Sequence, residues 1–181
     1  MIFTEGALQG AYIIDLEKHE DQRGFFARTF CQKEFAEHGL AEDMVQSNVS
    51  YSEQRGTLRG MHYQNPPHQE AKLIRCTQGA LYDVIVDVRG DSETYGQWMS
   101  VELSEDTHRM FYVPEGFAHG FMTLEDDTEV MYQVSEFYTP GAERGICYND
   151  PALGIDWPMP VQVISEKDLS WPAFDLYPAL S

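Results

Sequence analysis

Apolar and polar residues alternate along much of this chain, and the two-residue period limits the folds open to it. Between residues 81 and 88 the even positions are all apolar, while the odd positions include Asp83 and Asp87. Because successive side chains of a β-strand point to opposite faces, this pattern predicts a strand with one apolar and one polar face. Residues 128–135 alternate in the same way. Such half-buried strands are typical of antiparallel sheets.

Further strand-like stretches follow one another along the chain, with turn residues between them at intervals of roughly ten residues. These predicted strands are residues 11–16, 25–30, 45–50, 57–62, 71–77, 97–103 and 109–113. Only two short segments, residues 32–38 and 166–169, have a helical pattern. Many short strands at this spacing indicate a sandwich or a small barrel, so we predict an all-β jelly roll with short peripheral helices.

The length of 181 residues leaves room for one domain with a substantial core. The sequence contains no internal repeat, low-complexity tract or linker that would mark a second domain. Residues 139–181 are rich in proline, and we expect them to form loops and a short helix packed on the barrel. We therefore predict a single domain over residues 1–181.

The chain is strongly acidic, with 30 Asp and Glu against 12 Lys and Arg and a formal net charge of −18. This charge argues against binding to nucleic acids or anionic membranes, which require a basic face. No apolar stretch is long enough to span a bilayer, and no basic residue precedes the apolar N-terminal stretch as in a signal peptide. The three cysteines show no CxxC spacing, so we expect a reduced protein of the cytoplasm. Most basic residues lie before residue 76, where they can bind a small anion.

Three side chains with acid/base chemistry are predicted to point into the barrel. His62 shares a strand face with Leu58, and Tyr132 belongs to the apolar stripe of residues 128–135. Lys72 shares a face with Ile74, although burial of an ammonium group is costly without a partner. Each residue alone has a structural explanation, but together they are a candidate acid/base set.

A metal site is an alternative, because the histidines His62, His68 and His119 lie near Glu70 in the predicted barrel. Residues 114–119 match the Pro-x-Gly-x-x-His half of a cupin metal motif, but the chain contains no His-x-His pair. We therefore expect no metal. No nucleophile motif and no glycine-rich nucleotide loop is present, so we expect no covalent catalysis and no NAD or ATP site.

Several ordered motifs give the chain a family resemblance. They include Asp21-x-Arg23-Gly-Phe-Phe, Gln46-x-Asn48, Leu58-Arg-Gly-x-His62-Tyr-Gln, Pro114-Glu-Gly-Phe-Ala-His119-Gly-Phe and Ser165-Glu-Lys-Asp168. Over residues 10–172 the chain resembles the dTDP-4-dehydrorhamnose 3,5-epimerase family. The resemblance implies a cupin-type jelly roll (a double-stranded β-helix), a homodimer formed by strand exchange, and no metal or organic cofactor.

The resemblance also implies roles for individual residues. His62 would be the base, Asp168 its orienting partner, Tyr132 the acid and Lys72 the residue that stabilises the oxyanion. Tyr138 would stack on the nucleotide base. The other implied substrate contacts are Arg23, Gln46, Ser47, Asn48, Arg59, His119, Glu143 and Lys167.

The implied reaction inverts carbon 3, carbon 5 or both in a nucleotide-linked 4-keto-6-deoxyhexose. The expected conversion is dTDP-4-dehydro-6-deoxy-D-glucose to dTDP-4-dehydro-L-rhamnose, a step of deoxysugar synthesis for lipopolysaccharide O-antigen. The hydrogens on carbons 3 and 5 are acidic because both carbons lie next to the 4-keto group. A histidine base can remove such a hydrogen as a proton near neutral pH. The enolate that forms carries negative charge on oxygen 4, which a cation stabilises.

Arg28 departs from the family pattern, which commonly has Glu at this position. It either contacts the ligand, which would change the preferred nucleotide or sugar, or pairs with a local acid such as Glu34.

Three alternatives to the expected conversion stay open. They are an epimerase of one carbon acting on a CDP- or other dTDP-4-keto sugar, a metal-dependent cupin isomerase or dioxygenase, and a sugar-nucleotide binding protein without turnover.

Overall fold

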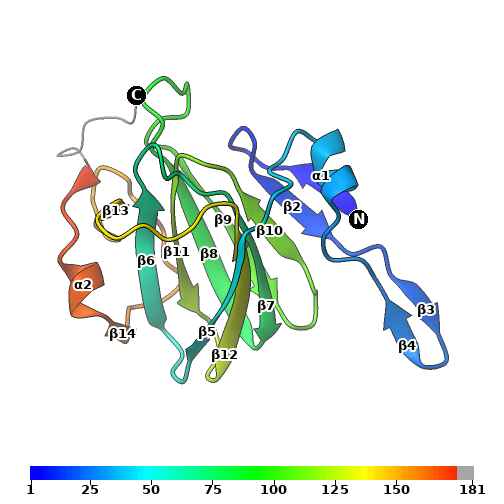
Figure 1. The fold of residues 1–181 in the computed structure, drawn as a ribbon. Helices are drawn as coiled ribbons and strands as arrows, with labels where there is room; N and C mark the ends of the chain where they lie inside the picture. Colours follow the sequence, from blue (N-terminus) through cyan, green and yellow to red (C-terminus); the bar gives the residue numbers. More distant parts are fainter. Residues whose placement is uncertain (175–181) are drawn as a thin grey trace.

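Two six-stranded β-sheets face one another in the computed structural model, which describes residues 1–174 (Figure 1). The first sheet has the order β1 (Ile2–Glu5), β2 (Tyr12–Asp15), β10 (Met110–Val113), β7 (Lys72–Gln78), β12 (Thr128–Val134) and β5 (Gln46–Ser52). The second has the order β13 (Glu143–Gly145), β6 (Thr57–Gln64), β11 (Phe117–Thr123), β8 (Ala80–Asp87) and β9 (Trp98–Ser104), and β14 (Val163–Ile164) pairs with β6. All pairings are antiparallel except that of β14 with β6. The arrangement is a cupin-type jelly roll, as predicted.

The core between the sheets is apolar and comes from both of them. Ile74 and Phe111 of the first sheet pack in one cluster with Leu81, Ile85 and Leu103 of the second, all of them inaccessible to solvent. Burying large aliphatic and aromatic side chains in this way stabilises each by about 1.5–3 kcal/mol. This cluster closes one part of the space between the sheets, while the polar side chains described below line another.

The outer face of the second sheet is also buried, which corrects one prediction. Val84 and Val86 of β8 pack outward against Ile146 and Leu153, which belong to the C-terminal part of the chain. The odd positions point between the sheets, and Asp83 and Asp87 are fully buried there. The prediction of a half-buried β8 was therefore wrong. The C-terminal segment covers the face that the alternation alone would leave exposed.

The two helices have different positions. Helix α1 (Gln32–Glu37) covers part of the first sheet, and its Phe35 is buried against Ile14 and Met110. Helix α2 (Glu166–Leu169) lies beside β6 at the other side of the molecule (Figure 1). Its bounds are those predicted from the sequence.

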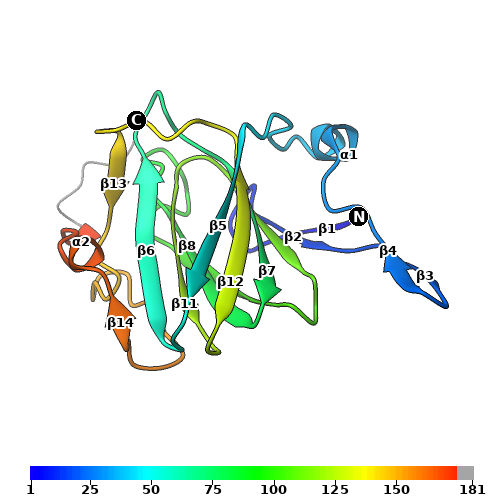
Figure 2. The same ribbon diagram turned by 60° about the horizontal axis from the view of Figure 1, so that its bottom comes forward.

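A two-stranded hairpin extends away from the body of the molecule (Figures 1 and 2). It consists of β3 (His19–Asp21) and β4 (Gly24–Phe26), and the side chain of Phe26, the last residue of β4, is largely exposed. The strand predicted over residues 25–30 therefore ends at Phe26.

The remaining predicted strands are present with boundaries shifted by one or two residues, but five strands were not predicted. They are β1, β3, β11, β13 and β14. Strand β11 lies in the middle of the second sheet between β6 and β8 and is buried on both faces, so its sequence does not alternate. Among the described residues, no helix is long and apolar enough to cross a membrane.

Candidate active site

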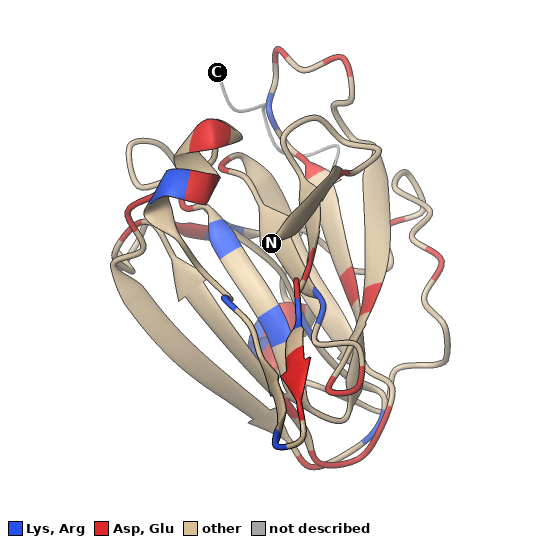
Figure 3. Cartoon of the chain, turned by 90° about the vertical axis from the view of Figure 1, so that its right-hand side faces the viewer, with Lys and Arg blue, Asp and Glu red and all other residues tan. Residues whose placement is uncertain are grey.

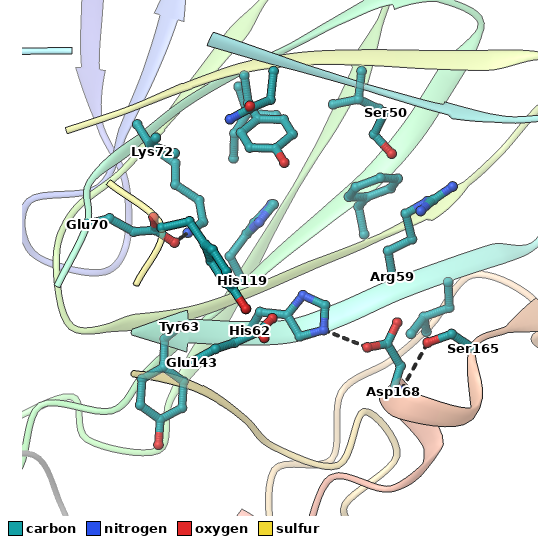
Figure 4. A pocket seen from close by; sticks show the side chains of 18 of the residues that line it. Ser50, Arg59, His62, Tyr63, Glu70, Lys72, His119, Glu143, Ser165 and Asp168 are labelled. Carbon is teal, nitrogen blue, oxygen red and sulfur yellow. Dashed lines mark hydrogen bonds and ion pairs between the residues drawn. The ribbon is translucent and has the colours of Figure 1, made fainter. Parts of the chain in front are cut away.

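A cavity of about 560 Å³ opens between the two sheets. Side chains from β5, β7 and β12 line it on one side, those from β6 and β11 on the other, and Asp168 of α2 closes one edge (Figure 4). The polar residues that line it include Gln46, Asn48, Arg59, His62, Gln64, Glu70, Lys72, His119, Tyr132, Tyr138, Glu143 and Asp168. Most of these residues are among the site residues expected from the sequence.

His62 and Asp168 form a hydrogen-bonded pair at the edge of the cavity. The His62 Nε2 atom lies 2.5 Å from Asp168 Oδ1, although the two residues are far apart in the sequence. Asp168 is nearly buried, and burial by itself raises the pKa of a carboxyl group. The bonds from His62, the Ser165 hydroxyl and the Gly60 backbone outweigh burial, so the pKa of Asp168 is lowered and the group is a carboxylate near neutral pH.

The position of Asp168 depends on how α2 is attached to the sheet. Ser165 caps the helix, because its Oγ accepts a hydrogen bond from the Asp168 backbone N–H at 3.1 Å. Just after the helix, the Trp171 ring lies against Gly145 of β13, where a Cβ atom would come within 2.4 Å of the ring. The same ring meets the His62 imidazole edge-on at 5.9 Å. Trp171 therefore packs the helix against the strand that borders β6.

Lys72 reaches the cavity from the first residue of β7 and is almost buried. Its ammonium group pairs with the Glu70 carboxylate, which also accepts a hydrogen bond from Gln64 Nε2 at 3.3 Å. This pairing offsets the cost of burying the Lys72 charge. The prediction that Lys72 and Ile74 share an inward face is confirmed.

Tyr132 faces the cavity from β12 between Val130 and Val134, as predicted. Burial and the nearby Glu70 carboxylate raise the pKa of Tyr132, with Arg59 opposing them. The phenol therefore keeps its proton near neutral pH. Tyr132 lies on the first sheet and His62 on the second, so the two groups enter the cavity from opposite sides.

His119 of β11 is paired with a buried acid that the sequence analysis assigned to a polar face. Its Nε2 atom lies 2.8 Å from Asp83 Oδ1, and Asp83 is fully buried. Burial raises the pKa of Asp83, while His119 and Lys72 lower it in part. The second Asp83 oxygen has no hydrogen-bond partner among the described residues.

The remaining cavity residues surround its mouth. Arg59 is held by bonds to the Tyr51 carbonyl and the Ser52 hydroxyl, and Gln46 accepts a hydrogen bond from the Tyr138 backbone N–H at 3.1 Å. At the rim, Lys167 Nζ donates to Glu143 at 2.6 Å. Figure 3 shows acidic residues at many places along the chain, with fewer basic residues among them. The cavity is lined by the cations Arg59 and Lys72 together with the acids Glu70, Glu143 and Asp168.

Four expected substrate contacts lie outside the cavity of their own chain. Ser47 points to the opposite face of β5, because the alternate residues Gln46, Asn48 and Ser50 face inward. Lys167 lies at the rim, bound to Glu143. Arg23 is in the projecting hairpin and pairs with Asp21. Arg28 pairs with Glu34 at 2.6 Å, the local contact that the sequence analysis considered as an alternative.

Sequence reasoning missed several cavity residues as functional candidates. Gln64 follows His62 by two residues on the same strand, so the two-residue period could have found it. Glu70 precedes Lys72 by two residues but was considered only as a metal ligand. Asp83 and Trp171 do not line the cavity themselves but contact His119 and His62, which do. No local signal marked them, because these partners come from distant parts of the chain.

Within residues 1–174, no group of three or more His, Cys, Asp or Glu side chains is placed to hold a metal ion. His62 bonds to Asp168, His119 to Asp83, and His68 lies 3.3 Å from the Thr139 hydroxyl. The three candidate histidines are thus directed at separate partners. The metal-dependent alternative gains no support from the arrangement of these residues.

The cavity combines a histidine–carboxylate pair, a protonated phenol on the opposite side and a cation between the sheets. These are the groups needed to remove a proton from carbon, stabilise the anion and return a proton. A jelly roll with such a cavity belongs to the class of isomerases that act by proton transfer.

Comparison with known proteins gives the family. The dTDP-4-dehydrorhamnose 3,5-epimerase profile matches residues 5–175. The enzyme of that name from Methanothermobacter thermautotrophicus is 46% identical over 172 residues, covering 93% of this chain and 92% of the relative. The chain belongs to the dTDP-4-dehydrorhamnose 3,5-epimerase family, which are isomerases acting on carbohydrate derivatives.

Two solved structures agree with this assignment. The dTDP-4-dehydrorhamnose 3,5-epimerase of Elizabethkingia anophelis superposes with a TM-score of 0.94 at 41% identity, covering 97% of each chain. The Legionella pneumophila enzyme, solved in complex with dTDP-4-keto-L-rhamnose, gives a TM-score of 0.91 at 39% identity and covers 98% of this chain and 95% of that chain.

Proposed function

We propose that this protein, as one epimerase domain, inverts carbons 3 and 5 of dTDP-4-dehydro-6-deoxy-D-glucose to give dTDP-4-dehydro-L-rhamnose. One observation carries the proposal: the candidate base His62 and the candidate acid Tyr132 enter one cavity from opposite sheets. Inversion at a carbon requires removal of a proton from one face and return of a proton to the other. A substrate held between the sheets would present its two faces to these two groups.

His62 is suited to remove the proton. The ionised Asp168 accepts a hydrogen bond, so it holds the proton of neutral His62 on Nε2. The lone pair then lies on Nδ1, which is left free for the substrate. When Nδ1 takes the proton from carbon 3 or carbon 5, the Asp168 carboxylate stabilises the imidazolium that forms.

The electron pair of the broken C–H bond moves to oxygen 4 and forms an enolate. The Lys72 ammonium is the cation of the inner cavity, and in this enclosed site it stabilises that oxygen more effectively than water would. Tyr132 then donates its proton to the opposite face of the same carbon. The raised pKa of Tyr132 keeps this proton available.

The residues at the mouth are suited to hold the nucleotide. Arg59 would bind the diphosphate with its guanidinium group, for which a planar fork of N–H donors is well shaped. Tyr138, largely exposed at the rim, would stack on the base, while Gln46, Asn48 and Glu143 offer hydrogen bonds around it. The proposed mechanism requires no metal or organic cofactor.

The protein would act as a homodimer formed by strand exchange, in the cytoplasm. The hairpin of β3 and β4 reaches beyond the body of its own chain (Figure 2), and 84% of its Arg23 side chain is exposed. Phe26 of the hairpin and Val49 on the outer face of β5 are exposed apolar side chains that a partner would cover. In such a dimer the hairpin would bring Arg23 and Arg28 toward the partner's cavity. All three cysteines are free thiols, which suits a reducing compartment.

Proton NMR in deuterated water tests the proposal, with a panel of dTDP- and CDP-4-keto-6-deoxyhexoses as substrates. We expect deuterium to replace hydrogen at both carbon 3 and carbon 5 of the dTDP-sugar, with formation of the L-rhamno product. Exchange and inversion at only one carbon would assign the single-site reaction instead. Faster turnover of the CDP-sugar would overturn the nucleotide assignment, and binding without any exchange would indicate a protein that does not turn over its ligand.

A further inference from the structure

One charged group inside the cavity neither takes nor gives a proton in the transfers described above, although it helps to raise the pKa of Tyr132. The Glu70 carboxylate lies beside Lys72, with about 15% of its side chain exposed, compared with 10% for that of Lys72. It is held by the Lys72 ammonium and by the Gln64 amide, and it lines the cavity (Figure 4). A largely buried carboxylate in a substrate cavity is costly unless it is bonded, so its remaining acceptor sites favour a ligand that donates.

The pair of Glu70 and Lys72 presents one acceptor next to one donor. An ammonium group carries three N–H donors, so Lys72 keeps donors for the substrate while it is bonded to Glu70. A carboxylate only accepts hydrogen bonds. Such a pair matches a carbonyl oxygen with a hydroxyl group on the neighbouring carbon, because the ammonium donates to the carbonyl and the carboxylate accepts from the hydroxyl.

The next inward residue along the same segment is apolar. Ile74 follows Lys72 by two residues on the same face of β7, lines the cavity and has no exposed surface. Residues two apart on one face of a strand are separated by about 7 Å. Glu70, Lys72 and Ile74 therefore present an acceptor, a donor and an apolar surface in that order.

A 4-keto-6-deoxyhexose carries groups in the matching order. Carbon 3 bears a hydroxyl, carbon 4 the carbonyl oxygen and carbon 5 the methyl group of carbon 6. We propose that Glu70 is a specificity-determining residue that accepts a hydrogen bond from the 3-hydroxyl while Lys72 binds oxygen 4. This sets the orientation of the ring, with carbon 3 toward Glu70 and the methyl group toward Ile74. The inference rests on the proposed function.

The test compares two substrates that differ only at carbon 3. They are dTDP-4-keto-6-deoxyglucose and its 3-deoxy counterpart, and the rate of deuterium incorporation at carbon 5 is measured for both. We expect the wild-type protein to prefer the 3-hydroxy sugar by at least about tenfold in kcat/KM, since a hydrogen bond to a charged group is lost with the 3-deoxy sugar. Equal kcat/KM values for the two sugars in the wild type would overturn the proposal without any variant.

Glu70→Gln keeps the size of the side chain and removes its charge, and we expect it to reduce the preference for the 3-hydroxy sugar by about tenfold. Glu102→Gln, on an exposed position of β9, is the matched control and should leave the preference unchanged. An equal loss of rate on both sugars in Glu70→Gln would mean that Glu70 acts only through its neighbours Lys72 and Tyr132, which contradicts the proposal. A wild-type protein that exchanges neither sugar would refute the proposed function itself, and the inference with it.

Discussion

Two buried aspartates, each bonded to a histidine, differ in the direction of their pKa shifts. Burial raises the pKa of both carboxyl groups. At Asp168 the bonds from His62, Ser165 and the Gly60 backbone outweigh burial and lower the pKa, whereas at Asp83 burial prevails. The hydrogen bonds to each carboxyl group, and not burial alone, therefore decide the direction of its pKa shift. This difference suits Asp168 to fix the tautomer of the base.

Replacing His62 by Asn should abolish epimerisation while leaving the fold and nucleotide binding intact. Loss of a general base typically lowers turnover by about 100- to 10,000-fold. Turnover is measured by NMR, dTDP binding by calorimetry and folding by circular dichroism. A variant with more than a tenth of wild-type turnover would show that His62 is not the base.

Replacing Tyr132 by Phe should separate the two halves of the reaction. The hydroxyl is needed only to return a proton, so exchange of substrate hydrogen with deuterated water should persist while inversion fails. Exchange is followed by mass spectrometry and inversion by NMR on the same samples. If both rates fall by the same factor, Tyr132 shapes the cavity and does not act as the acid.

At the scale of elements, the junction between α2 and β13 holds the candidate dyad together. The helix has only four residues, so its position depends on tertiary contacts more than on its own hydrogen bonds. The Trp171 ring lies where a Cβ atom on Gly145 would be, and it also contacts His62. Close approach of an indole ring to the backbone is the physical reason that glycine occupies position 145.

Replacing Gly145 by Ala should push Trp171 and α2 away from β13. We expect a loss of about 1–3 kcal/mol in the free energy of unfolding, as for overpacked cores, together with a lower kcat. Urea denaturation and NMR turnover measure the two effects. In a Trp171→Ala background the same substitution meets no ring and should cost much less; equal costs in both backgrounds would contradict this explanation.

The loop between β8 and β9 depends on one buried carboxylate. Asp87 accepts hydrogen bonds from Arg89 at 2.7 Å, Ser92 at 2.5 Å and Thr94 at 2.6 Å. Burial raises the pKa of Asp87, but these three partners outweigh it, so its pKa in the folded protein is lowered. The ionised form of Asp87 therefore stabilises the folded state.

The stability difference between the wild type and Asp87→Asn should depend on pH in a defined direction. Because the folded pKa lies below the unfolded value of about 3.9, the contribution is complete above that value and is lost as pH falls through the folded pKa. We expect the variant to be about 2 kcal/mol less stable at pH 7 and the difference to shrink below pH of about 4. Urea denaturation between pH 3 and pH 7 measures it. A difference that is constant with pH would mean that the Asp87 charge is not its source.

At the scale of the whole molecule, one chain presents a cavity together with a hairpin that does not contact it. Arg23 of the hairpin lies outside the cavity of its own chain, and the apolar hairpin residues Phe25 and Phe26 are exposed. In a dimer with two-fold symmetry each hairpin would make the same contact with the other chain. The candidate site would then be complete only in the assembled protein.

Mixing two inactive variants tests whether Arg23 acts on the partner's cavity. A mixed dimer of His62→Asn and Arg23→Ala chains contains one cavity with both native residues if Arg23 comes from the partner chain. Random reassortment should then restore up to about a quarter of wild-type activity. His62→Asn mixed with Tyr132→Phe is the control and should restore nothing, because both residues line the cavity of their own chain. No recovery in the first mixture would place Arg23 in its own chain's site or outside any site.

The sequence by itself determined the fold class and most of the candidate site. The two-residue period predicted that Leu58 and His62 share one strand face, that Lys72 and Ile74 share another, and that Tyr132 points the same way as Val130 and Val134. It could do so because the direction of a side chain along a strand is a local property. The family motifs covered nearly the whole chain and indicated further cavity residues such as Arg59, His119 and Asp168, although not Gln64 or Glu70.

Only the tertiary structure decided which faces are buried and which side chains meet. Asp83 is inside because the C-terminal segment covers the opposite, apolar face of β8, and β11 lacks alternation because it is buried on both sides. The bond between His62 and Asp168 joins residues 106 positions apart, so the family resemblance implied it but no local pattern could. Of the two alternatives for Arg28, the structure shows the pairing with Glu34, which depends on where α1 lies. A periodic pattern records the direction of each side chain along its own strand. What covers that side chain is set by segments distant in the sequence, and their packing is a property of the folded chain as a whole.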